Sequence, residues 1–526
     1  MSNTPLAGLQ LLKSGASDSY FWTAIAVGSL VIATTLRKWF LRGGLPLPPG
    51  PKGLPIIGNM LQLPSKHPWA VYNEWAKRYG DVIYLEIMGK PLMILNSLSA
   101  SVDLLEKKAQ IFSDRPQLIA LEMTGLDFGF GTMSYGPRWR AHRKAFHQFF
   151  NQREVAKYRP IIEQEGLAFL RRLAADPFSI HRESRNYFGT VLIRISYGIG
   201  HIGANKRLIE HAQAIVEGFG EIFAPGRFLV NIFPWLRHFP SWFPGTSWRA
   251  RFDYFKTARE LAVVHSFNET KERVKNGFQS EFPSVATQLI EALPAEGTLE
   301  YSSQEEVARN VSVISYTAGS DSAVSSAFAL FIALAKHPEI QQRAQEEIDA
   351  IVGSHRFPTW ADCDRLPYIH AIVKEVTRWH TVGPLGVPHV AAEDYEYKGH
   401  LVPKGTTVLY NAWAILHNPE TYNNPFEFNP ERFMRDGRIN PDVLDPDTVA
   451  FGFGRRICPG RHLSNEALVF MTACLLSVFD VKPRKDINGE IPPLELEVSS
   501  DMVSNPQMFK CEVVPRSQSH LNLVLE

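Results

Sequence analysis

Cysteine is scarce in this chain of 526 residues, which contains four, at positions 363, 458, 474 and 511. None of them forms a Cys-x-x-Cys pair, so the sequence lacks both the disulfide pattern of a small secreted domain and the spacing of structural zinc ligands. An excess of either charge is also missing, because 55 lysines and arginines face 54 aspartates and glutamates. With a net charge of +1 and no basic tract among aromatic residues, nucleic acid is not an expected partner. We expect a reduced protein that faces the cytosol.

Signs of disorder are absent as well, since aromatic residues make up 11% of the chain and no low-complexity block or internal repeat occurs. A chain of this length can bury a large core. Short runs near 82–87, 91–95 and 386–409 have the composition of strands. Helical patterns cover 137–150, 153–174, 256–277, 304–336, 339–352 and 367–380. The predicted fold class is mainly α with small β-sheets, without the βαβ repetition of a Rossmann fold or a barrel.

One segment near the N-terminus is unusually apolar. No charged residue occurs within 19–36, and Arg37, Lys38 and Arg42 follow at once. As a helix this run is about 27 Å long, which suffices for a thin bilayer such as that of the endoplasmic reticulum. The cations after it predict a cytosolic position for the following chain and a lumenal one for residues 1–18. The alternative is a cleaved signal peptide, against which the placement of the cations argues.

A stiff connection follows this predicted transmembrane anchor. Residues 37–58 are basic at first and then rich in proline, which fixes φ and removes hydrogen-bond donors. We expect an extended linker there and one large cytosolic domain over 59–526. A second apolar stretch, residues 228–244, mixes aromatic residues with prolines and resembles an element that dips into a membrane surface near a substrate entrance.

The strongest chemical signal is the segment Phe451–Gly460, which contains Cys458. Its glycines allow the backbone to approach a flat group, and Pro459 suits the first position of a following helix. A thiolate at a helix N-terminus is stabilised by the helix dipole and by free N–H groups, and Arg456 adds a positive charge. A single cysteine in such a loop suits one axial ligand of an iron porphyrin rather than a four-ligand metal site. The alternative is a buried structural cysteine beside a turn.

This segment resembles the haem-binding loop of the cytochrome P-450 monooxygenases, Phe-x-x-Gly-x-Arg-x-Cys-x-Gly, at every specified position. Shorter motifs of the same family also occur, and these are Trp139–Arg143, Ala318–Ser322, Glu375–Arg378 and Pro430–Phe433. Each is weak evidence alone, but together they span nearly the whole body of the chain. The chain is similar in its overall pattern to fungal microsomal members of secondary metabolism, of the O-methylsterigmatocystin oxidoreductase type.

The resemblance implies the cytochrome P-450 fold and a haem b whose iron is bound by the thiolate of Cys458. Phe451 belongs to the same cofactor-binding motif. Haem carries two carboxylates that need donors, and the implied partners are Trp139, Arg143, His389 and Arg456. Trp139 and Arg143 lie one helical turn apart, so both can reach the same carboxylate.

A second pair of charges is expected to have a structural role. Glu375 and Arg378 are three residues apart on a helix that Pro367 can start, so they share one face and are predicted to be buried together. A buried ion pair loses its hydration and requires further donors. The resemblance implies Arg432 as the third member. The alternative is a solvated pair on the surface.

The predicted helix 304–336 carries the expected catalytic pair. It opens with Ser302-Ser-Gln-Glu305, which has the form of a capping box. In its middle, Asp321 lies next to Ser322, and an acid beside a hydroxyl can pass protons to dioxygen. The family usually has threonine at the position of Ser322, so the coupling of oxygen use to product formation is in question. The alternative is that Ser322 bonds back to the carbonyl four residues earlier.

These features predict a membrane-anchored monooxygenase that inserts one oxygen atom from O₂ into a lipophilic small molecule, in fungal terpenoid or polyketide metabolism. The expected location is the endoplasmic reticulum membrane, with a single span. Two alternatives are a haem-thiolate isomerase or dehydratase and a non-catalytic haem- or lipid-binding membrane protein. Reductase-dependent consumption of NADPH separates the first alternative from the monooxygenase.

Electrons are expected to come from another protein, because no phosphate-binding glycine-rich motif or flavin domain follows residue 515. The resemblance implies NADPH–cytochrome reductase, with cytochrome b5 as a further candidate donor. Extra cations on the helix near 137–150 form either a solvated face or part of a docking patch, and these are Arg138, Arg140, His142, Lys144 and His147.

Overall fold

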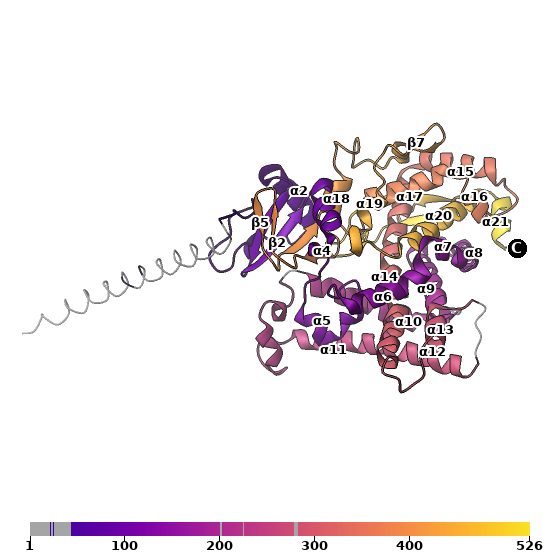
Figure 1. The fold of residues 1–526 in the computed structure, drawn as a ribbon. Helices are drawn as coiled ribbons and strands as arrows, with labels where there is room; N and C mark the ends of the chain where they lie inside the picture. Colours follow the sequence, from indigo (N-terminus) through magenta and orange to yellow (C-terminus); the bar gives the residue numbers. More distant parts are fainter. Residues whose placement is uncertain are drawn as a thin grey trace, which may run out of the picture.

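The computed structural model describes residues 44–199, 202–224, 226–277 and 282–525, together with Trp22 and Ile25. Apart from those two residues, the predicted anchor lies outside the described residues. Figure 1 shows a large helical part and, beside it, a smaller β-rich part that includes β2 and β5. The mainly helical fold with small sheets confirms the predicted fold class.

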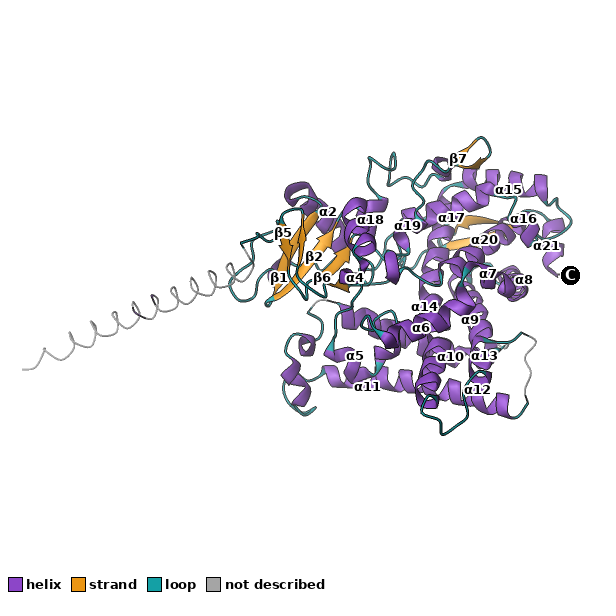
Figure 2. Cartoon of the chain, viewed as in Figure 1, coloured by secondary structure: helices purple, strands orange, loops and turns teal. Residues whose placement is uncertain are grey.

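Helices make up most of the described chain (Figure 2). The longer ones are α2 (Pro68–Tyr79), α6 (Pro137–Phe150), α8 (Arg159–Ala175), α9 (Ile180–Tyr197), α10 (Ile202–Phe223), α11 (Trp248–Arg259), α12 (Ser266–Lys275), α14 (Tyr301–Lys336), α15 (Pro338–Ile351), α17 (Pro367–Trp379) and α20 (Arg461–Val478). The short ones are α3 (Leu98–Ser101), α4 (Ala109–Phe112), α5 (Ile119–Thr124), α7 (Gln152–Val155), α13 (Val285–Glu291), α16 (Trp360–Cys363), α18 (Ala412–Leu416), α19 (Asp447–Ala450) and α21 (Gln518–Leu525). Two π-helical segments are η2 (Val102–Lys107) and η7 (Glu260–His265). The 3₁₀ segments are η1 (Met60–Gln62), η3 (Leu126–Phe128), η4 (Ala156–Tyr158), η5 (Leu229–Asn231), η6 (Pro234–His238), η8 (Pro430–Phe433) and η9 (Gly454–Arg456).

The largest sheet among the described residues has the strand order β1-β2-β6-β3. Its strands are β1 (Val82–Ile87), β2 (Lys90–Leu95), β6 (Thr407–Tyr410) and β3 (His389–Val390). β1 and β2 form an antiparallel hairpin, in which Met88 and Gly89 both have positive φ as a tight primed turn requires. β6 runs parallel to β2 and antiparallel to β3. Two-stranded sheets pair β4 (Tyr395–Tyr397) with β5 (His400–Val402), β7 (Met434–Arg435) with β8 (Arg438–Ile439), and β9 (Phe479–Pro483) with β10 (Cys511–Pro515).

The helix α14 passes through the centre of the helical part, where it packs against α6, α9, α10, α17 and α20 (Figure 1). Its side chains are buried over 311–317 and over nearly all of 323–335. Within the described residues it is the one helix long and apolar enough to cross a membrane, yet 67% of its most apolar stretch is buried in the protein. Its apolar character is therefore that of a core helix.

Two of the predicted helices begin elsewhere in the structure. The helix predicted from 153 begins at Arg159, because Asn151 caps the separate short helix α7. The pattern at 256–277 is the end of a longer helical run that starts at Trp248 and contains the π-helical η7.

The predicted capping box at 302–305 is wrong. The helix α14 already begins at Tyr301, and the preceding residue, Glu300, makes no side-chain cap. The Glu305 carboxylate accepts hydrogen bonds from Lys271 over 2.9 Å and from the hydroxyl of Tyr301 over 3.0 Å, so side chains engage it in place of a backbone N–H at the helix start.

Candidate functional site

Cys458 lies in the loop that joins α19 to α20, and the backbone holds it from several directions. Its N–H donates to the carbonyl oxygen of Phe451 over 2.7 Å, and the N–H groups of Gly460 and Arg461 donate toward its sulfur. Protein atoms surround the thiol, and this burial raises its pKa, while the two N–H groups and nearby arginines act in the opposite direction. Cys458 as a whole nevertheless keeps some exposed surface.

The loop around Cys458 differs from the prediction at one point. α20 begins at Arg461 with Gly460 at its N-cap, so Pro459 precedes the helix and does not open it. The offset leaves the first N–H groups of the helix free to point at the sulfur. On the other side of the loop, Gly454 has a φ of +54°, and a Cβ there would lie 2.4 Å from the carbonyl oxygen of Leu105. Only glycine allows the loop to lie so close to η2.

The donors predicted for the haem carboxylates lie together next to this loop. Arg456 donates to the carbonyl oxygens of Ser113, Phe130 and Met133 over 2.7, 3.1 and 2.7 Å. Its guanidinium lies 4.6 Å from the centre of the Trp139 ring. Arg143, one turn further along α6, donates to the carbonyl oxygen of Ile457 over 2.7 Å. The structure thus brings α6 and the cysteine loop into direct contact.

His389 enters the same region from β3. Its Nδ1 lies 2.7 Å from the carbonyl oxygen of Phe112, which can only accept, so Nδ1 carries the proton. Burial lowers the pKa of His389 well below its usual value, and the neighbouring arginines lower it further. The ring is therefore neutral here and presents an unprotonated Nε2. A carboxylate beside Nε2 would favour a second proton on the ring.

Arg115 completes the cluster and was missed by the sequence reasoning. It donates to the carbonyl oxygens of Gly131, Val387 and Pro388 over 2.9, 2.7 and 2.6 Å. Its signal in the sequence is weak, because it lies outside every motif and two of its three partners are more than 270 residues away.

These guanidinium groups are not paired with a carboxylate within the described residues, although the negative charge of Asp114 acts on Arg115 and Arg456 from nearby. Within the described residues, neither Arg115, Arg143 nor Arg456 forms an ion pair, and the nearby Asp114 accepts from backbone N–H groups instead. Burial, and next the charge of Arg456, lower the pKa of Arg115 to about 9, and burial lowers that of Arg456 to about 10. Buried cations without an anion are costly, so the cluster is suited to a ligand with negative groups.

The middle of α14 is open at one point, since Ala318 is exposed although Thr317 beside it is buried. Asp321 lies next on this stretch, with Oδ1 3.7 Å from the guanidinium of Arg185 on α9. Asn505 donates to its Oδ2 over 3.0 Å. Ser322 donates to the carbonyl oxygen of Ala318 over 3.2 Å, which is the back-bonded arrangement considered as the alternative. The structure therefore shows no hydrogen bond between Asp321 and Ser322.

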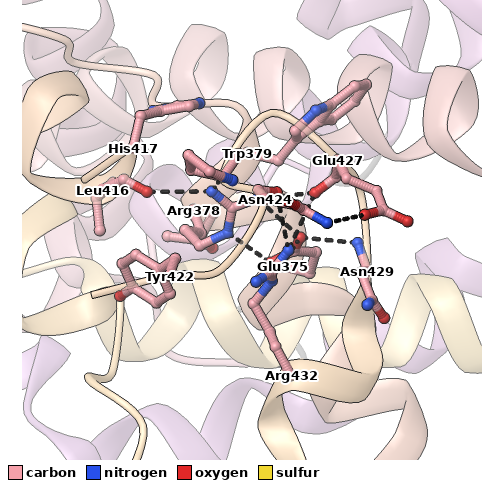
Figure 3. Close-up of polar contacts among 12 residues, drawn as sticks. Glu375, Arg378, Trp379, Leu416, His417, Tyr422, Asn424, Glu427, Asn429 and Arg432 are labelled. Atoms are coloured by element: carbon pink, nitrogen blue, oxygen red, sulfur yellow. Dashed lines mark hydrogen bonds and ion pairs between the residues drawn. The ribbon is translucent and has the colours of Figure 1, made fainter. Parts of the chain in front are cut away.

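Glu375 and Arg378 form an ion pair on α17 in which neither side chain has any exposed surface. Arg378 donates to the two carboxylate oxygens over 2.7 and 2.8 Å. Arg432 of η8 adds a third hydrogen bond over 3.1 Å, and the N–H of Asn429 a fourth over 2.8 Å. Figure 3 shows these groups converging on the carboxylate, with the remaining donors of Arg378 turned to backbone carbonyls such as that of Leu416.

Comparison with known proteins places this arrangement in a family. Residues 48–510 match the Cytochrome P450 family. The chain belongs to the cytochrome P450 family. It is 48% identical over 508 residues to the cytochrome P450 monooxygenase COX1 of Coprinopsis cinerea, which covers 95% of this chain and 98% of that protein. It is 38% identical to the cytochrome P450 monooxygenase claR of Ampulloclitocybe clavipes, over 95% of this chain and 92% of that protein. It is 36% identical to the tryptamine 4-monooxygenase of Psilocybe cyanescens, over 91% of this chain and 94% of that protein.

As a cytochrome P450, the protein is a monooxygenase of the oxidoreductase class, with haem b as its cofactor. Enzymes of this family use O₂, an external redox partner and a small-molecule substrate. The residues present fit the cofactor, because buried arginines without an ion pair among the described residues lie next to the loop of a cysteine that is not fully covered. Two carboxylates would supply the negative charge that this region of the cytochrome P450 lacks.

The Glu375 network leads to a first prediction. Glu375→Gln leaves Arg378 charged and buried without its anion, so the free energy of unfolding should fall by about 3–5 kcal/mol. Denaturant unfolding followed by haem absorbance measures this loss. The matched control is Glu431→Gln, whose exposed pair with Arg343 should contribute less than about 1 kcal/mol. Equal losses in the two variants would contradict the structural role of Glu375.

Proposed function

We propose that this cytochrome P450 is a membrane-anchored haem-thiolate monooxygenase in which Cys458 is the axial ligand of the haem iron. The observation that supports this most directly is the Cys458 sulfur, which receives two backbone N–H groups in a protein interior that otherwise disfavours negative charge. The two N–H groups favour a thiolate at this position. A cysteine bound to a metal ion is a thiolate, because coordination removes the proton of the thiol. When bound, haem supplies the activation of O₂, one atom of which is inserted into the substrate.

The haem carboxylates are held, in this proposal, by the cations next to the loop. Arg115 and Arg456 approach them as fixed charges, and Trp139, Arg143 and His389 complete the donor set. Phe451 acts through its carbonyl oxygen, which holds the N–H of Cys458 and so fixes the ligand. The roles of the sequence-predicted residues are thereby divided between binding the carboxylates and holding the cysteine.

The axial assignment gives a second prediction. Cys458→Ala should abolish the long-wavelength Soret band of the reduced carbon monoxide complex, because that band depends on a thiolate opposite the carbon monoxide. Difference spectroscopy of the purified protein measures it. Cys363→Ala removes a different buried thiol and should keep the band. Persistence of the band in Cys458→Ala would show that another residue binds the iron.

Proton delivery is assigned to Asp321 and Ser322 of α14. Arg185 and Asn505 hold the carboxylate of Asp321 beside the open middle of the helix. The hydroxyl of Ser322 donates to Ala318 in the resting structure, so it has to turn away from that carbonyl before it can donate to another group. Serine turns more readily than threonine, because it lacks the β-methyl group that restricts the rotamer.

This assignment predicts a defect in coupling. Ser322→Ala and Asp321→Asn should keep their haem and their Soret band, but release more hydrogen peroxide for each NADPH consumed. General acid catalysis contributes about 10²–10⁴-fold to such steps, and bound water can replace part of it. Ser326→Ala is the matched control, since Ser326 back-bonds to the carbonyl of Ser322 one turn later. If Ser322→Ala remains as tightly coupled as the parent, Ser322 is a packing residue only.

The electron donor is proposed to be NADPH–cytochrome reductase, with cytochrome b5 as a further candidate. Two of the cations expected on α6 are engaged within the protein. His142 is fully buried and hydrogen-bonded to Asn310, and Arg138 is paired with Glu306. The exposed residues left for an acidic partner on this helix are Arg140, Lys144 and His147, so a docking patch here would use three of the five residues considered.

Membrane attachment is proposed through one span at 19–36, with residues 1–18 in the lumen of the endoplasmic reticulum, 37–58 as the linker and the catalytic domain over 59–526 in the cytosol. The stretch 228–244 supports a second contact, since Trp235 is 56% and Trp242 80% exposed. It lies beside the β1–β2 turn, because Lys90 donates to the carbonyl oxygen of Asn231 over 2.7 Å.

The segment from Leu54 to Leu61 adds to this apolar surface. Leu54, Ile56 and Leu61 are exposed, and the same segment is bridged through Gly58 to Ile87 at the end of β1. Both apolar segments therefore meet the same end of the β1–β2 hairpin. Side chains of this kind on a surface are typical of contact with lipid.

A fourth prediction concerns this surface. Deletion of residues 1–42 should leave part of the protein bound to membranes. Trp235→Ser with Trp242→Ser in the deleted form should lower the remaining binding about tenfold or more, because burial of one large apolar side chain contributes ~1.5–3 kcal/mol. Flotation with phospholipid vesicles measures the bound fraction, and the haem spectrum reports on folding. Leu299→Ser changes another exposed apolar residue and is the control. Unchanged binding of the double variant would remove this element from the membrane contact.

The substrate is proposed to be a lipophilic small molecule of fungal secondary metabolism, a terpenoid or a polyketide. Apolar side chains near the open middle of α14 support a lipophilic substrate, among them Phe128, Phe130 and Ile314, all buried. The name of the Psilocybe cyanescens relative specifies tryptamine, so substrates differ among the relatives. Product profiling of a host that expresses this chain with a reductase identifies the substrate class.

A further inference from the structure

Arg461 occupies an unfavourable position for a cation. It is the first residue of α20, a helix of 18 residues, and the positive end of the helix dipole repels a positive charge there. Within the described residues it forms no ion pair. The nearby carboxylate of Asp447 accepts its hydrogen bond from Asn465 instead. A residue that breaks a local rule without a compensating pair indicates a functional constraint.

The contact that Arg461 does make is with the cysteine. Its Nη1 donates to the carbonyl oxygen of Cys458 over 3.1 Å, and its backbone N–H donates toward the sulfur of the same residue. A second guanidinium, that of Arg143 on α6, donates to the preceding carbonyl, that of Ile457. Two successive carbonyl groups at the ligand are thus each held by an arginine from a different helix.

All the polar groups of Cys458 are therefore engaged. Its N–H is held by Phe451, its carbonyl by the side chain of Arg461, and its sulfur by the N–H groups of Gly460 and Arg461. Burial opposes a negative charge on this sulfur, and the charges of Arg143 and Arg461 favour it. Arg143 also faces the proposed site of the haem carboxylates, whereas the side-chain hydrogen bond of Arg461 goes to Cys458.

We propose that Arg461 is a positioning residue that fixes the peptide of Cys458 and sets the electron donation of its thiolate to the haem iron. The proposal rests on the proposed axial role of Cys458. A cation beside the ligand withdraws negative charge from the sulfur and favours the state with one more electron. It follows that Arg461 raises the reduction potential of the haem and makes the first electron easier to accept.

The test uses the full-length holoenzyme and removes the charge of residue 461 while keeping a hydrogen-bond donor there. Arg461→Gln keeps an amide that can donate to the carbonyl of Cys458, and Arg461→Lys keeps the charge. Redox titration with dithionite and mediators, without reductase, measures the ferric–ferrous equilibrium. Arg461→Gln should shift it three- to tenfold toward the ferric form, where tenfold is ~59 mV for a one-electron couple. The C–O stretching frequency of the ferrous carbon monoxide complex should fall as well, while Arg461→Lys should shift the equilibrium less than twofold.

Arg455→Gln is the matched control in the same loop. Arg455 donates to the hydroxyl of Tyr135 over 2.8 Å and has no contact with the peptide of Cys458, so its replacement should leave the potential unchanged. Equal shifts of the reduction potential in Arg455→Gln and Arg461→Gln would show that only the net surface charge matters, and would overturn the proposal. An Arg461→Gln protein with an unchanged potential, and a changed KM for the reductase only, would make Arg461 a docking residue and overturn it too.

The outcome for Arg461 is separable from that for the ligand itself. If Cys458→Ala keeps the long-wavelength Soret band, the axial assignment fails and the proposal for Arg461 fails with it. If that band is lost in Cys458→Ala and the potential does not respond to Arg461→Gln, only the role of Arg461 is overturned.

Discussion

Burying Glu375 and Arg378 together removes the hydration of both charges, and the C-terminal half of the fold is arranged to offset that cost. Arg378 extends its spare donors to the carbonyls of Leu416, Pro425 and Glu427. The carboxylate accepts from Arg432 and from the backbone of Asn429. Leu416 ends α18, Arg432 lies in η8, and the other partners lie in the chain between these two elements, which precedes the cysteine loop. The ion pair therefore ties α17 to the part of the chain that leads to Cys458.

The charges of the arginine cluster next to the cysteine loop are balanced in a different way. At Glu375 the protein supplies both charges of an ion pair, whereas Arg115, Arg143 and Arg456 form no ion pair among the described residues, and backbone carbonyls take up their N–H groups. Carbonyls satisfy hydrogen bonds but do not neutralise charge. The first arrangement is complete within the chain, and in our proposal the second becomes complete when the negatively charged cofactor binds. Cofactor binding and folding are linked through this difference, because a ligand that binds the native state alone also stabilises it.

The local features of the fold could be predicted from the sequence, and the long-range ones could not. The hairpin of β1 and β2 and the helices α6 and α17 follow from patterns within a few residues, and the structure shows them close to the predicted positions. Glu375 with Arg378 is a spacing of three on one helix, visible in the sequence itself. Arg115 could not be found in this way, because its partners at 387 and 388 are brought to it only by the completed fold. The capping box at 302–305 failed for a related reason, since Lys271, distant in the sequence, binds Glu305.

The β1–β2 hairpin joins two apolar segments that are about 170 residues apart in the sequence. Through these contacts the hairpin holds the two segments near each other. If the first segment inserts into a bilayer, as we propose, the second is present there at a high effective concentration, so the two would bind with the advantage of a bivalent ligand. Attachment at two points on a rigid body also restricts tilt. The hairpin would therefore orient the catalytic domain relative to the lipid surface, as well as hold it close.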